Sequence, residues 1–94
     1  MNPSPEQREQ IRLSILRYCE AADQYGLAAT LLLQFLRNEG WRGLTAERLE
    51  LELVYLADKS FLAPVLKPIS PENRAWRITA VGRDFLATQL GGNA

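Results

Sequence analysis

The sequence predicts one small domain, residues 1–94, that is mainly helical and carries a single β-hairpin, an α+β fold. Apolar residues recur at helical spacing in three successive segments of the first 58 residues. Two short β-rich segments then flank a Ser-Pro-Glu-Asn turn, and one more helical repeat follows. The expected order is therefore helix, helix, helix, strand, strand, helix, with an ordered core over residues 5–90.

The first helix is expected over residues 5–24. Ser4 is a typical N-cap, Pro5 suits the first helical position, and Gln7 completes a capping box. Its apolar face follows the spacing i, i+4, i+7, i+8 and i+11 from Ile11 onward. Its polar face carries three arginines that we expect to be solvated, Arg8, Arg12 and Arg17.

A second helix is expected over residues 27–38, and Gly40 and Gly43 bracket the turn after it. Its buried face is expected to consist of Leu27, Leu31, Phe35 and Leu36, with Leu32 and Leu33 widening it. A third helix is expected over residues 45–58, where Thr45 caps the N-terminus. The spacing i, i+4, i+7 turns three leucines of this helix inward, Leu49, Leu53 and Leu56.

The hairpin is expected between residues 62 and 79. Pro64 and Pro68 cannot donate ladder hydrogen bonds, so the first strand should be irregular or lie at a sheet edge. No loop residues separate the second strand from the following helix. We therefore expect Thr79 to end the strand and to cap a fourth helix over residues 80–90.

Three helices followed by a hairpin form the winged helix-turn-helix plan, and two segments carry a family resemblance. Residues 53–62, LVYLADKSFL, resemble the end of the third helix in many winged-helix regulators, with Ser60 where Gly is usual. Residues 76–86, WRITAVGRDFL, resemble the strand-Thr-x-x-Gly-helix segment after the wing, where Gly82 permits close backbone approach. The chain resembles small winged-helix proteins encoded in Mu-like prophages, often labelled ArsR-like regulators. The resemblance implies a DNA-binding transcriptional regulator, without the paired cysteines of metal-sensing repressors.

Composition limits the function classes. The 94 residues contain one cysteine and no histidine, so Ser-His-Asp catalysis and a tetrahedral metal site cannot be built. We therefore expect no enzyme, no cofactor and no metal. No apolar run is long enough for a transmembrane helix, and the N-terminus lacks a signal-peptide pattern, so we expect a cytoplasmic protein without membrane contact. Cys19 and Trp76 are expected in the core.

Charge is unevenly distributed, although 11 basic and 11 acidic side chains cancel overall. Residues 45–58 carry a net charge of minus three, whereas residues 59–83 carry a net charge of plus four. In DNA-binding winged helices the third helix enters the major groove and the wing contacts the DNA backbone. For double-stranded DNA bound by a homodimer, we expect Arg48 at base edges, and three cations at phosphates, Lys67, Arg74 and Arg77.

The acidic third helix leaves a second hypothesis open, a protein-interaction module without DNA binding. With the three leucines inward, the helical wheel turns Leu51, Val54 and Tyr55 outward beside Glu47 and Asp58. An exposed apolar patch of this kind is typical of a protein contact. Alternatively, the first and fourth helices cover the three apolar residues. For the hairpin cations, the alternative is that they are solvated charges that protect a strand edge.

Overall fold

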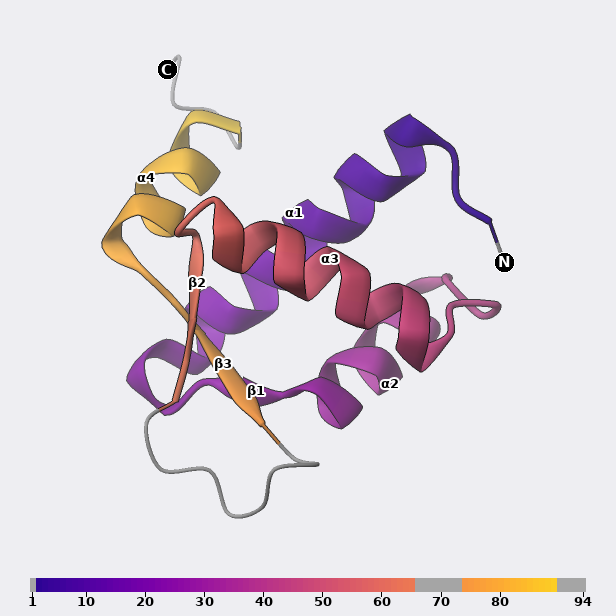
Figure 1. Ribbon diagram of the computed structural model, residues 1–94, viewed down its shortest axis with the longest axis horizontal. Coiled ribbons are helices and arrows are strands. Elements are labelled where there is room, and N and C mark those ends of the chain that lie inside the picture. Colours follow the sequence, from indigo (N-terminus) through magenta and orange to yellow (C-terminus); the bar gives the residue numbers. More distant parts are fainter. Residues whose placement is uncertain (1, 66–73, 90–94) are drawn as a thin grey trace.

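The computed structural model describes residues 2–65 and 74–89, which fold into helices and a small antiparallel sheet (Figure 1). In chain order the elements are α1 (Pro5–Ala22), the 3-10 turn η1 (Asp23–Tyr25), β1 (Leu27–Ala28), α2 (Ala29–Glu39), α3 (Ala46–Asp58), β2 (Leu62–Pro64), β3 (Ala75–Ile78) and α4 (Ala80–Gln89). This confirms the predicted α+β class. In the described part of the chain, no helix is long and apolar enough to cross a membrane.

Side-chain caps fix the starts of three helices, as predicted. The Ser4 hydroxyl accepts a hydrogen bond from the Gln7 backbone N–H at 3.2 Å, and the Gln7 side chain accepts one from the Ser4 N–H at 2.9 Å. The Thr45 hydroxyl caps α3, and the Thr79 hydroxyl accepts from the Gly82 N–H at 3.0 Å at the start of α4. Each cap satisfies helix N–H groups that have no partner within the helix.

A left-handed residue ends α3 and sends the chain into β2. Ser60 has a φ of +66°, and its N–H donates to the Ala57 carbonyl at 2.9 Å. The Phe61 N–H donates to the Leu56 carbonyl at 2.9 Å, which completes a Schellman motif. Thr79 closes the junction, because its hydroxyl donates to the Ser60 carbonyl. The backbone here therefore adopts the conformation for which glycine is usual, but with serine.

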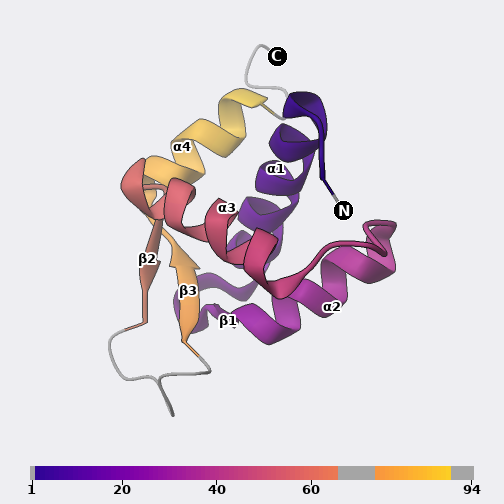
Figure 2. The ribbon, with the colours of Figure 1, turned by 45° about the vertical axis from the view of Figure 1, so that its right-hand side comes forward.

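The sheet has the order β1-β3-β2, and both pairings are antiparallel (Figure 2). Leu27 lies opposite Trp76, so the first two residues of the predicted second helix are instead a short strand. Pro64 is exposed on the edge strand β2, in agreement with the prediction. The predicted turn at residues 70–73 and Pro68 of the predicted first strand lie outside the described residues.

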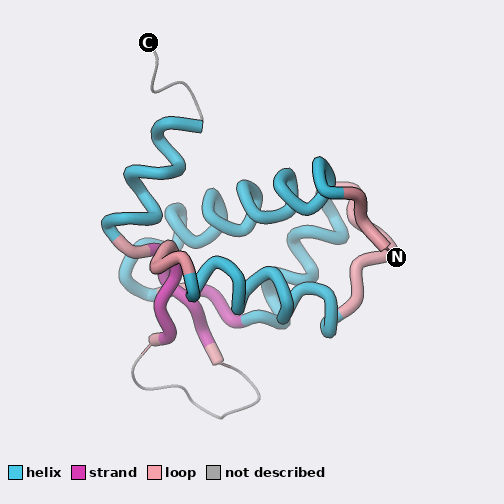
Figure 3. Tube along the Cα trace, turned by 45° about the horizontal axis from the view of Figure 1, so that its top comes forward, coloured by secondary structure: helices cyan, strands magenta, loops and turns pink. Residues whose placement is uncertain are grey.

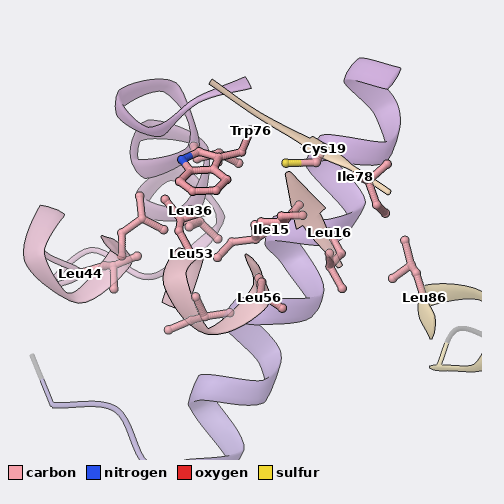
Figure 4. Packing of buried hydrophobic residues seen from close by; sticks show 14 residues of the cluster. Ile15, Leu16, Cys19, Leu36, Leu44, Leu53, Leu56, Trp76, Ile78 and Leu86 are labelled. Carbon is pink, nitrogen blue, oxygen red and sulfur yellow. The ribbon is translucent and has the colours of Figure 1, made fainter. Parts of the chain in front are cut away.

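The buried apolar side chains of the helices and the sheet form one core, and α1 passes through it (Figure 4). Cys19 and Trp76 belong to it, as predicted. The predicted face of α2 is wrong at Leu31, which is 37% exposed, whereas Leu32, predicted only to widen that face, is fully buried. The buried apolar side chains are Ile11, Ile15, Leu16, Cys19, Leu32, Leu36, Leu44, Leu49, Leu53, Leu56, Leu62, Trp76, Ile78 and Leu86.

One side of α3 packs against the core, and the other side faces away from it. Helix α1 contacts α2, α3 and α4, and the strands gather at one end of the helices (Figure 3). Leu49, Leu53 and Leu56 are at most 2% exposed, as the spacing predicted. The opposite side of α3 faces solvent.

Candidate functional site

The outer side of α3 exposes the three apolar residues that the sequence identified as protein-contact candidates. Leu51 is 58% exposed and Val54 45%, so α1 and α4 do not cover them, whereas Tyr55 is 38% exposed and Arg12 of α1 stacks on its ring. We call these three residues the α3 face. The exposed side of the same helix also carries three carboxylates, Glu47, Glu50 and Asp58. The surface therefore combines an apolar patch with negative charge.

Behind the α3 face, a buried carboxylate joins α1 to α3. Glu52 is 2% exposed, and its Oε1 accepts a hydrogen bond from Arg12 Nε at 2.6 Å. Its Oε2 lies 3.2 Å from Arg48 Nη2, one helical turn earlier on α3. We call Arg12, Arg48 and Glu52 the ion cluster. Two guanidinium groups share one carboxylate, so the ion cluster carries one net positive charge.

The ion cluster corrects the expected positions of two arginines. Arg12 is not fully solvated, since its side chain is only 22% exposed. Arg48 does not extend freely from the outer half of α3, because its side chain is 20% exposed and paired with Glu52. Its Nε is buried and has no hydrogen-bond partner in the described part of the chain. A base contact by Arg48 therefore requires its separation from Glu52, and that contact stays a prediction.

Two cations lie beside Tyr55 at the edge of the α3 face. The Arg12 Cζ lies 3.6 Å from the ring centroid, and the Lys59 Nζ lies 5.7 Å from it. The stacking of a guanidinium on an aromatic ring contributes about 0.5–1 kcal/mol at exposed sites. Arg12 therefore orders the ring, which lowers the entropy that Tyr55 loses when a partner binds.

The structure describes two of the three predicted hairpin cations, and it does not place these two on one surface. Lys67 lies outside the described residues. Arg74 and Arg77 are exposed, and neither pairs with a carboxylate among residues 2–65 and 74–89. The Arg74 Cζ is 5.9 Å from the Trp76 ring, whereas Arg77 alternates to the opposite face of β3. Their joint contact with a DNA backbone stays a prediction.

A hydrogen-bond cluster around Glu39, at the end of α2, was not predicted. Its carboxylate accepts hydrogen bonds from Ser14 Oγ and Tyr18 OH at 2.7 Å each and from Trp41 Nε1 at 3.2 Å. Burial raises the pKa of Glu39, but these bonds and the Arg17 charge outweigh it, and the net pKa is lowered. The hydrogen bond to Glu39 in turn raises the pKa of Tyr18. Because two donors lie on α1, 21 and 25 residues away, no local pattern signals this cluster.

The described residues hold no candidate metal cluster, and their cysteine is buried. Residues 2–65 and 74–89 contain no group of three or more His, Cys, Asp or Glu placed to hold a metal ion. Cys19 is fully buried, and burial raises the pKa of its thiol to about 12. A thiol with this pKa stays protonated at neutral pH, so it is a poor nucleophile.

The chain matches no protein-family model and no curated protein.

Proposed function

We propose that this chain is a winged helix-turn-helix protein whose third helix binds another protein. The order of the elements supports the fold assignment, with α2, a turn and α3 followed by the β2–β3 hairpin in the place of the wing. The sheet order β1-β3-β2 adds a short strand between the first two helices, which joins the hairpin to the helices. Within this fold, we propose membership of the small Mu-like prophage group, often labelled ArsR-like.

The α3 face is the observation that carries the proposed protein contact. Leu51 is more than half exposed at a position where a DNA-reading helix would present hydrogen-bond donors. Carboxylates on the exposed side of α3 repel phosphate, but they attract lysine and arginine. The partner we propose has an apolar centre that covers the α3 face and basic residues at its rim. Such an arrangement is typical of protein interfaces.

Charge also argues against a second copy of this chain as the partner. A two-fold interface brings the same patch of both subunits together. Pairing two α3 faces would therefore bring the carboxylates of one copy, Glu47, Glu50 and Asp58, near those of the other, and like charges at an interface are destabilising. We therefore assign the α3 face to a different protein.

A Leu51→Asp variant tests the protein contact. It adds a charge to the centre of the α3 face without touching the core, because Leu51 is 58% exposed. Val81→Asp is the matched control, since Val81 is 52% exposed on α4. Wild type and both variants are used as baits in cells that make the chain, and captured proteins are then purified and titrated against each bait. Equal thermal melts of the three baits show that folding is preserved.

The expected result is a basic partner that binds wild type and Val81→Asp alike. Its Kd for Leu51→Asp should be at least about 30-fold higher, the loss typical of a residue at the centre of an interface. A purified partner that binds Leu51→Asp as tightly as wild type would exclude the α3 face as its binding surface.

DNA binding is a second candidate, favoured by the exposed and unpaired guanidinium groups of Arg74 and Arg77 in the described part of the chain. In this proposal the protein is a phage- or prophage-type transcriptional regulator that binds duplex DNA as a homodimer. Arg48 contacts bases after leaving Glu52, and Lys67 joins Arg74 and Arg77 at phosphates. The carboxylates of α3 oppose this arrangement, which is why DNA binding ranks second.

Amide NMR with a mixed-sequence duplex tests the DNA candidate. Binding at about 50 mM salt should weaken steeply at about 200 mM, because phosphate contacts depend on salt. An Arg74→Ala/Arg77→Ala double variant should bind all sequences more weakly, with a salt dependence reduced by about two phosphate contacts. An unchanged wild-type spectrum at low salt would exclude DNA binding, and unchanged affinity of the double variant would exclude the hairpin as the DNA contact.

A further inference from the structure

A cavity of about 240 Å³ lies between α1, α3 and α4 and opens to solvent. Its walls are largely apolar and include Leu13 from α1 and Leu56 from α3. Phe61 and Phe85 add a pair of stacked rings, with centroids 4.5 Å apart and planes inclined by 16°. All four side chains are partly or fully buried. The cavity therefore has an apolar wall with two aromatic side chains, which suits an apolar or aromatic group.

The charged side chains at the cavity give it a net positive charge. Lys59 is exposed and pairs with no carboxylate within residues 2–65 and 74–89. Arg12, also at the cavity, belongs to the ion cluster, which keeps one positive charge after Glu52 is counted. Glu9 contributes one exposed carboxylate, and Gln89 is neutral. Together these groups carry one net positive charge, so the cavity favours an anion.

The size of the cavity limits the ligand. Sites for drug-sized ligands occupy roughly 300–1,000 Å³, so a cavity of about 240 Å³ suits one ring with a short side arm. We propose that this cavity binds a small aromatic carboxylate. The ring packs on Phe61 and Phe85, and the carboxylate pairs with Lys59. Tyr55 of the α3 face also lines the cavity, but Leu51 and Val54 do not, so this inference does not rest on the proposed protein contact.

Three probes with the same ring and different end groups test the inference. These probes are 3-phenylpropionate, 3-phenylpropan-1-ol and 3-phenylpropan-1-amine, each titrated into the isotope-labelled chain and followed by NMR. The carboxylate should bind with a Kd on the order of 1 mM, as expected for a ligand of this size. Its shifts should concentrate at Leu13, Phe61 and Phe85. The alcohol should bind about three- to five-fold more weakly, the effect of one exposed ion pair, and the amine more weakly still.

Two charge-removing variants identify the cation that selects the carboxylate. Lys59→Gln should weaken 3-phenylpropionate binding about three- to five-fold and leave the alcohol unchanged. Arg42→Gln is the matched control, because Arg42 is an exposed cation before the start of α3 whereas Lys59 follows its end. It should change neither affinity.

Three results would overturn the inference. The first is an absence of shifts at about 10 mM probe, ten times the expected Kd. The second is equal affinity for the three probes, which would show an apolar cavity without charge selection. The third is an unchanged carboxylate affinity in Lys59→Gln, which would exclude Lys59 as the anion partner. None of these results depends on whether Leu51→Asp loses a protein partner.

Discussion

Replacing Glu52 with alanine is expected to destabilise the domain by about 3 kcal/mol. The substitution leaves Arg12 and Arg48 beside each other without the carboxylate that both contact, at 2.6 and 3.2 Å. Removing one partner of a buried ion pair typically costs about 3–5 kcal/mol. The two arginine side chains are 22% and 20% exposed, so water partly compensates, and the lower end of the range applies.

This loss is large for a chain of 94 residues, whose free energy of unfolding is about 5–14 kcal/mol. It corresponds to a fall in Tm of about 12–24 °C. Urea unfolding followed by tryptophan fluorescence measures it directly, because Trp76 is part of the core. Glu50→Ala is the matched control, since it removes an exposed carboxylate two residues away and should change the stability by less than about 0.5 kcal/mol.

An apolar replacement of the whole ion cluster separates the effect of unpaired charge from that of lost packing. The triple variant Arg12→Met/Arg48→Met/Glu52→Leu should regain most of the stability lost in Glu52→Ala, because apolar replacement of buried ions is often neutral. A loss below about 1 kcal/mol in Glu52→Ala would refute the reasoning, since the two guanidinium groups would then not depend on the carboxylate.

Four further predictions follow from individual contacts. Ser60→Gly should raise stability by about 0.5–1 kcal/mol in urea unfolding, because Ser60 has a φ of +66°. Gly82→Ala should lower it by about 1–3 kcal/mol, because a Cβ there meets the Phe61 carbonyl oxygen. Cys19, with a thiol pKa of about 12 and no exposed surface, should react with a thiol reagent only when urea opens the fold. Glu39 has a lowered pKa, so the stability advantage of wild type over Glu39→Gln should be full near neutral pH and shrink as the pH falls below 4.5.

Helix starts and the inward side of α3 could be predicted because their signals are local. Ser4, Thr45 and Thr79 act on N–H groups within three residues, and all three caps are present. The leucine spacing of α3 also predicted which side is outward, including Leu51 and Val54. A cap or a helical face depends on residues one or two turns apart, so short stretches of sequence contain the whole signal.

Strand β1 was missed because nothing near it in the sequence indicates a strand. Its two residues are extended because Leu27 pairs with Trp76, 49 positions later. Two residues are too few to show alternation. The error also shifted the phase of α2, since the leucines at 31, 32 and 33 fit more than one helical face. The structure buries Leu32 and leaves Leu31 partly exposed.

Of the two ion pairs in the ion cluster, only the pair within α3 has a local signal in the sequence. Glu52 lies three positions after Leu49, on the inward side of α3, and a carboxylate buried there requires a cation. Arg48 is four positions earlier and therefore within reach. The second cation, Arg12, comes from α1, 40 positions earlier, and no pattern within α3 predicts it.

The ion cluster also determines which surface can perform which function. Arg48 is the only lysine or arginine of α3, and Glu52 neutralises part of its charge from the inward side. The outward side of α3 therefore presents apolar groups and carboxylates, and in the DNA proposal the phosphate contacts come from the hairpin cations. In the DNA proposal Arg48 also contacts bases, so the protein contact and the DNA contact share α3, and only the DNA contact uses the hairpin. Arg74→Ala/Arg77→Ala should therefore weaken DNA binding and leave the protein contact unchanged, whereas Leu51→Asp should remove the protein contact and also oppose DNA through its added carboxylate.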